Sequence, residues 1–175
     1  MAALTGDTPL WAMMETAAGM LNAAAIAAHP RLAGMVMGTN DLVKELYAQH
    51  VPGRAPLLTS LSLSLLAARA AGVAILDGVY NDVKDDEGFA AECRQGREMG
   101  FDGKTLIHPG QVEVCNETYA PSEKDVEEAR GILQAWEAGA GTGVVTYNGK
   151  MIENLHVDIA RRVLATHEAI ISRTA

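Results

Sequence analysis

Short apolar runs alternate with longer segments of helical character over residues 1–115. Each run is followed by a polar or glycine-marked turn, and this alternation is typical of βα units that build a parallel sheet. The run Met35-Val36-Met37 is apolar on both faces, as a buried parallel strand should be. The pattern predicts four strands, at about residues 9–15, 32–38, 73–80 and 104–107.

The segments between these runs predict helices. They lie at Ala17–Ala28, Leu42–Gln49, Ser60–Ala71 and Gly88–Met99. Gly72 follows one of them and fits a C-cap, because glycine adopts the left-handed conformation that ends many helices. The segment Val51–Pro56, with two prolines and a glycine, is expected to be a loop.

The pattern changes after His108-Pro109. Helices are expected at Ser122–Ala138 and Glu153–Ser172, with a glycine-rich, hairpin-like piece between them in which Val144, Val145 and Tyr147 form a short strand. Ser122-Glu123-Lys124-Asp125 has the form of a capping box. We therefore expect residues 1–115 to form the βα array and residues 116–175 to form a lid or oligomerisation extension.

Composition narrows the functional classes. The net charge of −8 disfavours nucleic acid and anionic membranes as partners, because both require a basic field. Neither a signal peptide nor an apolar stretch long enough to span a membrane occurs, so a cytoplasmic protein is expected. Cys93 and Cys115 lack metal-ligand spacing and are expected to be reduced, structural thiols. Methionines 13, 14, 35 and 37 are expected to pack in the core.

Two carboxylates stand at the ends of neighbouring strands, where βα folds place their chemistry. Glu15 ends the first strand, and Asp41 follows the second. Two such acids repel unless a cation or a proton lies between them, so a hard divalent ion such as Mg²⁺ is a reasonable inference. Helix capping is the alternative: Asp41 fits an N-cap, whereas Thr16 would cap a helix better than Glu15.

Several longer motifs carry a family resemblance. In chain order they are Met14-Glu15-Thr16, Gly38-Thr39-Asn40-Asp41-Leu42, Leu76-Asp77-Gly78-Val79-Tyr80-Asn81-Asp82, Gly100 to Pro109, Asn116 with Pro121, and Gly149-Lys150-Met151-Ile152. Their order and spacing resemble the C-terminal part of the citrate lyase beta subunit and malyl-CoA lyase group within the HpcH/HpaI aldolase superfamily.

The resemblance implies an α/β fold that is the C-terminal half of a TIM (β/α)8 barrel, four βα units followed by a helical lid. It also implies a Mg²⁺-dependent carbon–carbon lyase that acts on a 3-hydroxyacyl-CoA thioester such as citryl-CoA or malyl-CoA. Glu15 and Asp41 match the metal ligands of the family. Glu15 and Asp77 are the expected substrate-binding residues, with a solvated acidic turn as the alternative for Asp77.

The catalytic residue that the resemblance implies lies in the lid, after a Met-Ile pair. The family has Asp there, whereas this chain has Glu153, which is one methylene longer. The alternative is that Glu153 caps or begins the final helix, where a carboxylate favours the positive helix end. His108, in an Ile-His-Pro turn, is expected to be a structural hydrogen-bonding residue.

The first four strands of the family barrel have no counterpart in this sequence. We therefore expect a truncated chain that forms homo-oligomers, trimeric or hexameric in the full-length family, or that pairs with a missing half. Two other functions stay open. One is an acyl-CoA thioesterase that uses the same metal site, and the other is a catalytically inert half-barrel that serves in assembly.

Overall fold

The computed structural model describes residues 6–139 and 145–174. The chain divides into two compact units, Met1–Tyr119 (unit 1) and Ala120–Ala175 (unit 2). Within the described residues, no helix is long and apolar enough to cross a membrane.

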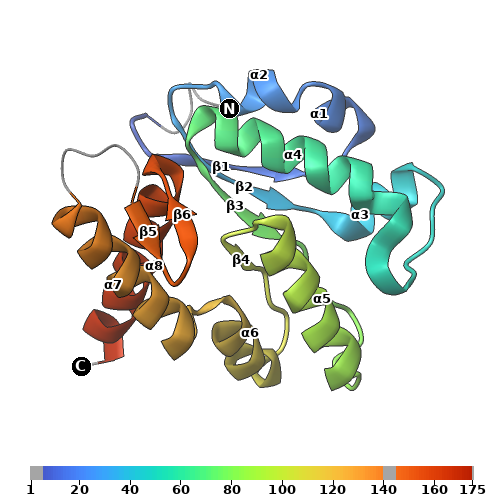
Figure 1. Ribbon diagram of the computed structural model, residues 1–175. Coiled ribbons are helices and arrows are strands. Elements are labelled where there is room, and N and C mark those ends of the chain that lie inside the picture. Colours follow the sequence, from blue (N-terminus) through green and yellow to red (C-terminus); the bar gives the residue numbers. More distant parts are fainter. Residues whose placement is uncertain (1–5, 140–144, 175) are drawn as a thin grey trace. The chain divides into compact units, whose positions relative to one another are not determined.

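Unit 1 is built on a parallel sheet whose strands follow their order in the sequence (Figure 1). The strands are β1 Leu10–Met14, β2 Leu32–Met37, β3 Ala74–Asp77 and β4 Gly103–Lys104. Each neighbouring pair is parallel, so every connection is a crossover that contains helix. The α/β architecture expected from the sequence is therefore confirmed, although β3 and β4 are shorter than the apolar runs suggested.

Unit 1 contains six α-helices and two short 3₁₀ helices among the described residues. They are α1 Ala17–Leu21, α2 Ala23–Ala27, α3 Thr39–Glu45, η2 Pro52–Leu57, α4 Leu58–Ala71, α5 Asp86–Met99, η3 Pro109–Gln111 and α6 Val112–Tyr119, and η3 and α6 follow the last strand. Gly72 adopts the left-handed conformation at the end of α4 (φ 70°), which confirms the expected C-cap.

Three local predictions are corrected by the structure. The expected helix Ala17–Ala28 is broken at Asn22, whose side-chain amide donates to the Ala18 carbonyl at 2.8 Å. The helix after β2 starts at Thr39 and ends at Glu45, earlier than expected, and Tyr47 just beyond it has φ 54°. The expected loop Val51–Pro56 forms most of η2.

One face of the sheet forms the core of unit 1, because side chains alternate between the two faces along each strand. Met14, Met35, Met37 and Ile75 are each 1% exposed or less, and they belong to one apolar cluster with Leu61 of α4. These strand residues share a face by register, and Figure 1 shows α1, α2 and α4 along one side of the strands. The helices therefore seal this face from water.

The opposite face of the sheet is apolar yet open. Trp11 and Met13 of β1 are 51% and 55% exposed, and their register partners on β2 are Gly34 and Val36. A Cβ atom at Gly34 would lie 2.4 Å from the Trp11 ring, so only glycine lets the indole lie over β2. Met13 is thus not a core residue, in contrast to the prediction from sequence.

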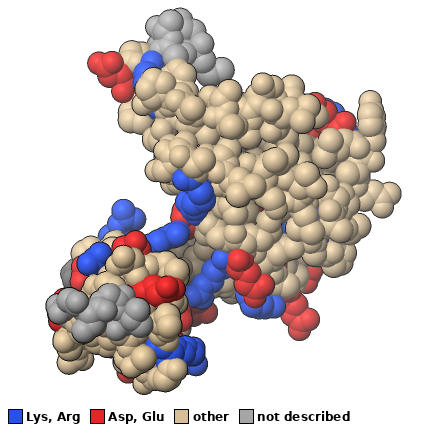
Figure 2. Space-filling view, turned by 45° about the horizontal axis from the view of Figure 1, so that its top comes forward, with Lys and Arg blue, Asp and Glu red and all other residues tan. Residues whose placement is uncertain are grey.

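Helices α1, α2 and α4 carry almost no charge. Arg69 is their one ionised side chain, and Leu21, Leu63 and Leu66 are exposed on them. Figure 2, which turns the top of Figure 1 toward the viewer, shows a broad surface with few Lys, Arg, Asp or Glu side chains. The charges of the described residues are concentrated elsewhere on the chain.

Unit 2 contains α7 Glu123–Ala138, the antiparallel strands β5 Val145–Tyr147 and β6 Lys150–Ile152, and α8 Asn154–Thr174. Its small core contains Val126, Ala129, Ile152, Val157 and Ala160, each 3% exposed or less. The capping box at the start of α7 is confirmed, with the Ser122 hydroxyl accepting from the Asp125 amide at 3.1 Å. Val144, expected in the short strand, lies outside the described residues.

Candidate active site at the carboxyl ends of the strands

Glu15 directly follows β1, and strand alternation places it on the open face with Trp11 and Met13. Its side chain lies against Gly38, which follows β2. A Cβ atom at Gly38 would lie 2.4 Å from the Glu15 Cβ and 2.6 Å from its Oε2. Glycine at this position therefore leaves the space in which the Glu15 carboxylate reaches the start of α3.

Helix capping does not employ the Glu15 side chain. The Thr16 hydroxyl accepts a hydrogen bond from the Gly19 amide at 3.0 Å and caps α1, as its residue type suggested. The Glu45 carboxylate accepts from the Ala17 amide at 3.1 Å, so it serves the same helix end. The Glu15 carboxylate instead lies against Gly38.

Asp41 is not the N-cap of the helix that follows β2, so that alternative is wrong. The capping position is Gly38, and Asp41 is the third residue of α3, with an exposed side chain. The helix begins two residues before Asp41, because Thr39 and Asn40 already have helical geometry. The carboxylate is thus one short turn away from the glycine over which Glu15 lies.

The donor set fits a hard divalent cation. Glu15 and Asp41 offer carboxylate oxygens, the ligands that Mg²⁺ prefers in proteins. No group of three or more His, Cys, Asp or Glu side chains within residues 6–139 and 145–174 could hold a metal. An ion at this pair would keep several coordination positions for water or substrate oxygens, as Mg²⁺ sites usually do.

Asp77, at the end of β3, is fully buried and lies on the helix-covered face. Its two oxygens accept hydrogen bonds from Arg54 Nη1 at 2.7 and 2.8 Å, and one of them also accepts from Lys104 Nζ at 3.2 Å. The alternative of a solvated acidic turn is wrong for Asp77. A carboxylate enclosed in this way holds two cations in place.

The ion pairs around Asp77 extend to helix α5. Lys104 Nζ donates to the Glu92 carboxylate at 2.6 Å, and Arg54 Nη1 lies 3.7 Å from the same group. Arg54 Nε donates to Gln95 Oε1 at 2.7 Å. Two cations and two anions therefore balance in formal charge, which is the condition under which charges tolerate burial.

The segment Gly100–Pro109 supports this network. Gly100 ends α5 in a left-handed conformation (φ 105°), and Lys104 supplies the buried ammonium. The Thr105 amide and hydroxyl each donate to the Asp77 carbonyl at 3.0 Å. His108 Nδ1 accepts from the Gly110 amide at 3.1 Å, which confirms that this histidine is a structural hydrogen-bonding residue.

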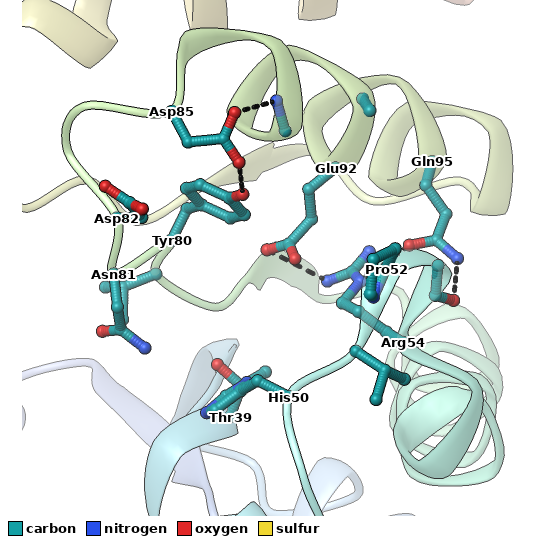
Figure 3. Close-up of a pocket in the computed structure, with 15 residues that line it drawn as sticks. Thr39, His50, Pro52, Arg54, Tyr80, Asn81, Asp82, Asp85, Glu92 and Gln95 are labelled. Carbon is teal, nitrogen blue, oxygen red and sulfur yellow. Dashed lines mark hydrogen bonds and ion pairs between the residues drawn. The ribbon is translucent and has the colours of Figure 1, made fainter.

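A pocket of about 520 Å³ opens above the network, between the segment that contains η2, the turn after β3 and helix α5. Figure 3 shows Arg54, Glu92, Tyr80 and Asn81 around its open centre, with Thr39 and His50 beside them. The Asn40 and Asn81 amides exchange hydrogen bonds of 3.0 and 2.6 Å. This reciprocal pair links the start of α3, which carries Asp41, to the turn that lines the pocket.

Sequence reasoning missed Arg54, Glu92 and Lys104 as site residues. The available signal was Pro52-Gly53-Arg54-Ala55-Pro56, in which an arginine lies between two prolines in a segment too stiff for a mobile surface loop. For Asn81 and Asp82 the sequence-based expectation of a polar turn agrees with the structure, in which both residues are exposed.

Tyr80 and Asp85 form a hydrogen-bonded pair at the rim of the pocket. The Tyr80 hydroxyl donates to Asp85 at 2.6 Å, and the Gly88 amide donates to the other oxygen at 2.9 Å. These bonds lower the pKa of Asp85. The bond to Asp85, together with burial, raises the pKa of Tyr80 to about 12. The pair thus anchors the turn after β3 to the start of α5.

Glu153 lies in unit 2, immediately before α8, and is exposed. Its backbone amide donates to His156 Nδ1 at 3.0 Å, and its carbonyl accepts from the amides of His156 and Val157. Glu153 therefore begins the final helix through its backbone. These backbone hydrogen bonds do not fix the Glu153 carboxylate, so its direction depends on the side-chain rotamer.

Comparison with known proteins assigns the family. The model of the HpcH/HpaI aldolase/citrate lyase family matches residues 3–109. The chain belongs to this family. It is 59% identical over 171 residues to a (3S)-malyl-CoA thioesterase of Cereibacter sphaeroides, a match that covers 97% of this chain and 60% of the relative.

Other members of the HpcH/HpaI family show the same partial coverage. The citrate lyase beta subunit of Escherichia coli is 40% identical over 166 residues, 93% of this chain and 55% of the relative. The crystal structure of CitE from Mycobacterium tuberculosis, in complex with magnesium, acetoacetate and coenzyme A, is 33% identical with a TM-score of 0.78. That match covers 90% of this chain and 60% of the CitE chain. The chain spans 55–60% of the length of these relatives.

Replacing Asp77 by Asn tests the buried network of this family member. The substitution keeps the shape and the acceptor for the Gly78 amide but leaves two buried cations with one carboxylate. We expect a loss of about 3–5 kcal/mol in the free energy of unfolding, measured by urea denaturation. Asp82→Asn, on the exposed turn, should change stability by less than about 0.5 kcal/mol. Equal effects of both substitutions would contradict the role of Asp77.

The raised pKa of Tyr80 predicts a loss of stability at high pH. The folded pKa of about 12 exceeds the ordinary value of 10.0, so the contribution is complete below pH 10 and is lost as the pH rises through 12. Tyr80→Phe should lack this component in denaturation curves between pH 9 and 12, and it should remove an absorbance step of tyrosinate near pH 12. Tyr47→Phe, at a 96% exposed side chain, is the control. Parallel curves for wild type and Tyr80→Phe would refute the assignment.

Proposed function

We propose that this chain carries the metal-binding part of an enzyme that acts on a 3-hydroxyacyl-CoA thioester of the malyl-CoA or citryl-CoA type. The observation that carries the proposal is the position of Glu15, whose carboxylate lies over Gly38 at the start of the helix that bears Asp41. Relatives named malyl-CoA thioesterase and citrate lyase beta subunit align over more than nine tenths of the chain.

The sheet is proposed to be the C-terminal half of a (β/α)8 barrel. Four parallel strands stand in sequence order, and each is followed by helix, which is the repeat of that fold. The open face that contains Trp11 and Met13 would then be the barrel interior, which side chains fill in closed barrels. Exposure of this apolar face favours association of the chain with copies of itself or with the remaining strands.

Mg²⁺ is the proposed cofactor, held by Glu15 and Asp41, with Glu15 also placed to orient the substrate. A bound Mg²⁺ supplies Lewis-acid polarisation of a substrate carbonyl or alkoxide oxygen and a template for its carboxylate. Gly38 contributes by leaving the space that the Glu15 carboxylate occupies. Asp77 acts indirectly, because the ion pairs of its buried carboxylate fix β3 and β4 beside the site.

Glu153 is the proposed acid or base at the α-carbon of the thioester. The exposed carboxylate begins α8, and the bonds of its backbone to His156 and Val157 fix the chain at that point. A carboxylate held on a rigid helix start can give or take a proton once it lies within hydrogen-bond reach of the substrate. We propose that it reaches the site in the assembled protein.

Carbon–carbon cleavage is the proposed reaction: malyl-CoA would yield acetyl-CoA and glyoxylate, and citryl-CoA would yield acetyl-CoA and oxaloacetate. Thioester hydrolysis is the second candidate, favoured by one observation. The identity to a (3S)-malyl-CoA thioesterase is 59%, against 40% to a citrate lyase beta subunit. In hydrolysis, water attacks the thioester carbon, and the products are malate and free coenzyme A.

The reaction is identified by its products. The purified chain is incubated with malyl-CoA and Mg²⁺ at several protein concentrations. Glyoxylate trapped as its phenylhydrazone indicates cleavage, whereas free thiol without glyoxylate indicates hydrolysis. Neither product at any concentration would contradict an activity of this chain and favour an inert assembly fragment.

The metal site is tested without activity by Mn²⁺ binding, followed by electron paramagnetic resonance. Glu15→Gln removes one of two carboxylate ligands, so the affinity for Mn²⁺ should fall more than about tenfold. Glu98→Gln, on the exposed surface of α5, should leave binding unchanged. Unaltered Mn²⁺ binding by Glu15→Gln would overturn the assignment of the ligands.

The role of Glu153 is tested by measuring kcat and the affinity for Mn²⁺ separately. Glu153→Gln should lower kcat by about 10²–10⁴-fold, because a general acid or base contributes that much. Its affinity for Mn²⁺ should equal that of the wild type. Glu168→Gln, at an exposed position of α8, is the matched control. A kcat unchanged by Glu153→Gln would show that another group moves the proton.

A further inference from the structure

The pocket above the Asp77 network is separate from the metal-binding pair. Its lining includes the segment from His50 to Arg54, the turn from Val79 to Asp82, and α5 residues such as Glu92, but neither Glu15 nor Asp41. Arg54 contacts both Glu92 and Asp77, and Asp77 lies on the helix-covered face of the sheet. Glu15 continues the open face. A volume of about 520 Å³ suffices for a small organic molecule.

Arg54 lines this pocket and carries an unused donor. The residue is 4% exposed, and its Nε and Nη1 atoms are committed to Gln95 and Asp77. Its Nη2 atom is buried and has no hydrogen-bond partner among residues 6–139 and 145–174. A buried guanidinium nitrogen without an acceptor is costly, so an arrangement that keeps one points to an acceptor supplied from outside.

Thr39 presents a second unused group. It is 3% exposed and lines the same pocket, and its hydroxyl oxygen is buried with no hydrogen-bond partner in the described part of the chain. The two groups come from different segments, the start of α3 and η2. Their convergence on one cavity is what a polar binding site requires, and it is not the by-product of a single helix end.

The backbone around Arg54 is held in an unusual conformation. Arg54 has φ 54° and Gly53 has φ 73°, so two successive residues are left-handed. The Gln95 amide donates to the Gly53 carbonyl at 2.7 Å and holds this kink against α5. Left-handed non-glycine residues cost free energy and gather at ligand sites, where their neighbours over-determine them.

The charges of the rim select the ligand. Asp82, Asp85 and Glu92 surround the cavity, and Arg54 is the buried cation facing them. A phosphate group or another dianion would be repelled by these three carboxylates. Val51, Pro52, Val79 and Ala91 supply apolar wall. The cavity thus offers two donors and an apolar wall inside an acidic rim.

We propose that this pocket binds a small uncharged carbonyl compound, such as an amide, through Arg54 Nη2 and the Thr39 hydroxyl. The carbonyl oxygen accepts from both groups, and a branched alkyl group of the ligand packs against Val51 and Ala91. An uncharged ligand meets the donors without introducing an anion beside Glu92. Binding here requires neither the metal ion nor the thioester reaction.

The test uses three probes with one carbon skeleton and different head groups: isobutyramide, isobutyrate and isopropylamine, with inorganic phosphate as a fourth. Binding to the purified chain is measured by saturation-transfer difference NMR. Isobutyramide should give a saturable signal, and the three charged probes should bind at least about tenfold more weakly. Preference for isobutyrate or phosphate, or saturation by none of the probes, would overturn the proposal.

Two variants locate the binding. Ala91→Leu fills the pocket from the exposed face of α5 and should abolish the isobutyramide signal, whereas Ala70→Leu, at an exposed position of α4 outside the pocket, should retain it. Thr39→Val removes the hydroxyl at constant shape. It should weaken binding about two- to tenfold and raise the melting temperature, because an unpartnered buried hydroxyl is lost. Binding that survives Ala91→Leu, or a stability lowered by Thr39→Val, would contradict the site.

Discussion

The buried carboxylate of Asp77 determines how η2 and β4 assemble around the end of β3 in unit 1. A fully enclosed anion is tolerated only when cations and hydrogen-bond donors surround it, and Arg54 and Lys104 supply both. These partners come from different segments, η2 and β4. The folded state therefore holds both segments at the end of β3, and the stability of each segment depends on the other two.

The same interaction separates the chemistry of the two sheet faces. On the helix-covered face, the charges neutralise one another and shape a pocket. On the open face, Glu15 follows the exposed side chains of Trp11 and Met13, and within the described part of the chain its carboxylate has no ion pair and caps no helix. Strand alternation produces this division, since Glu15 and Asp77 end their strands on opposite faces. Asp77 is thus held in a buried ion-pair network, whereas Glu15 lies on the open face.

Local sequence signals predicted the elements and several of their ends. Thr16, Gly72 and Ser122 act at helix ends because capping depends on neighbouring residues only. The start of α3 was missed because the polar sequence Thr39-Asn40 resembles a turn as much as a first helical turn. The expectation that functional residues lie at strand ends singled out Glu15 and Asp41. It singled out Asp77 in the same way, because sequence spacing alone does not show that Asp77 is buried.

The reciprocal bonds between the Asn40 and Asn81 amides connect two regions that otherwise stand apart. Asn40 precedes the proposed metal ligand Asp41, and Asn81 lines the pocket. Each amide both donates and accepts, so a shift of either segment breaks both hydrogen bonds together. An occupant of the pocket that moved Asn81 would therefore change the affinity of the proposed ligand pair for its cation, and the cation would change the affinity for that occupant by the same factor.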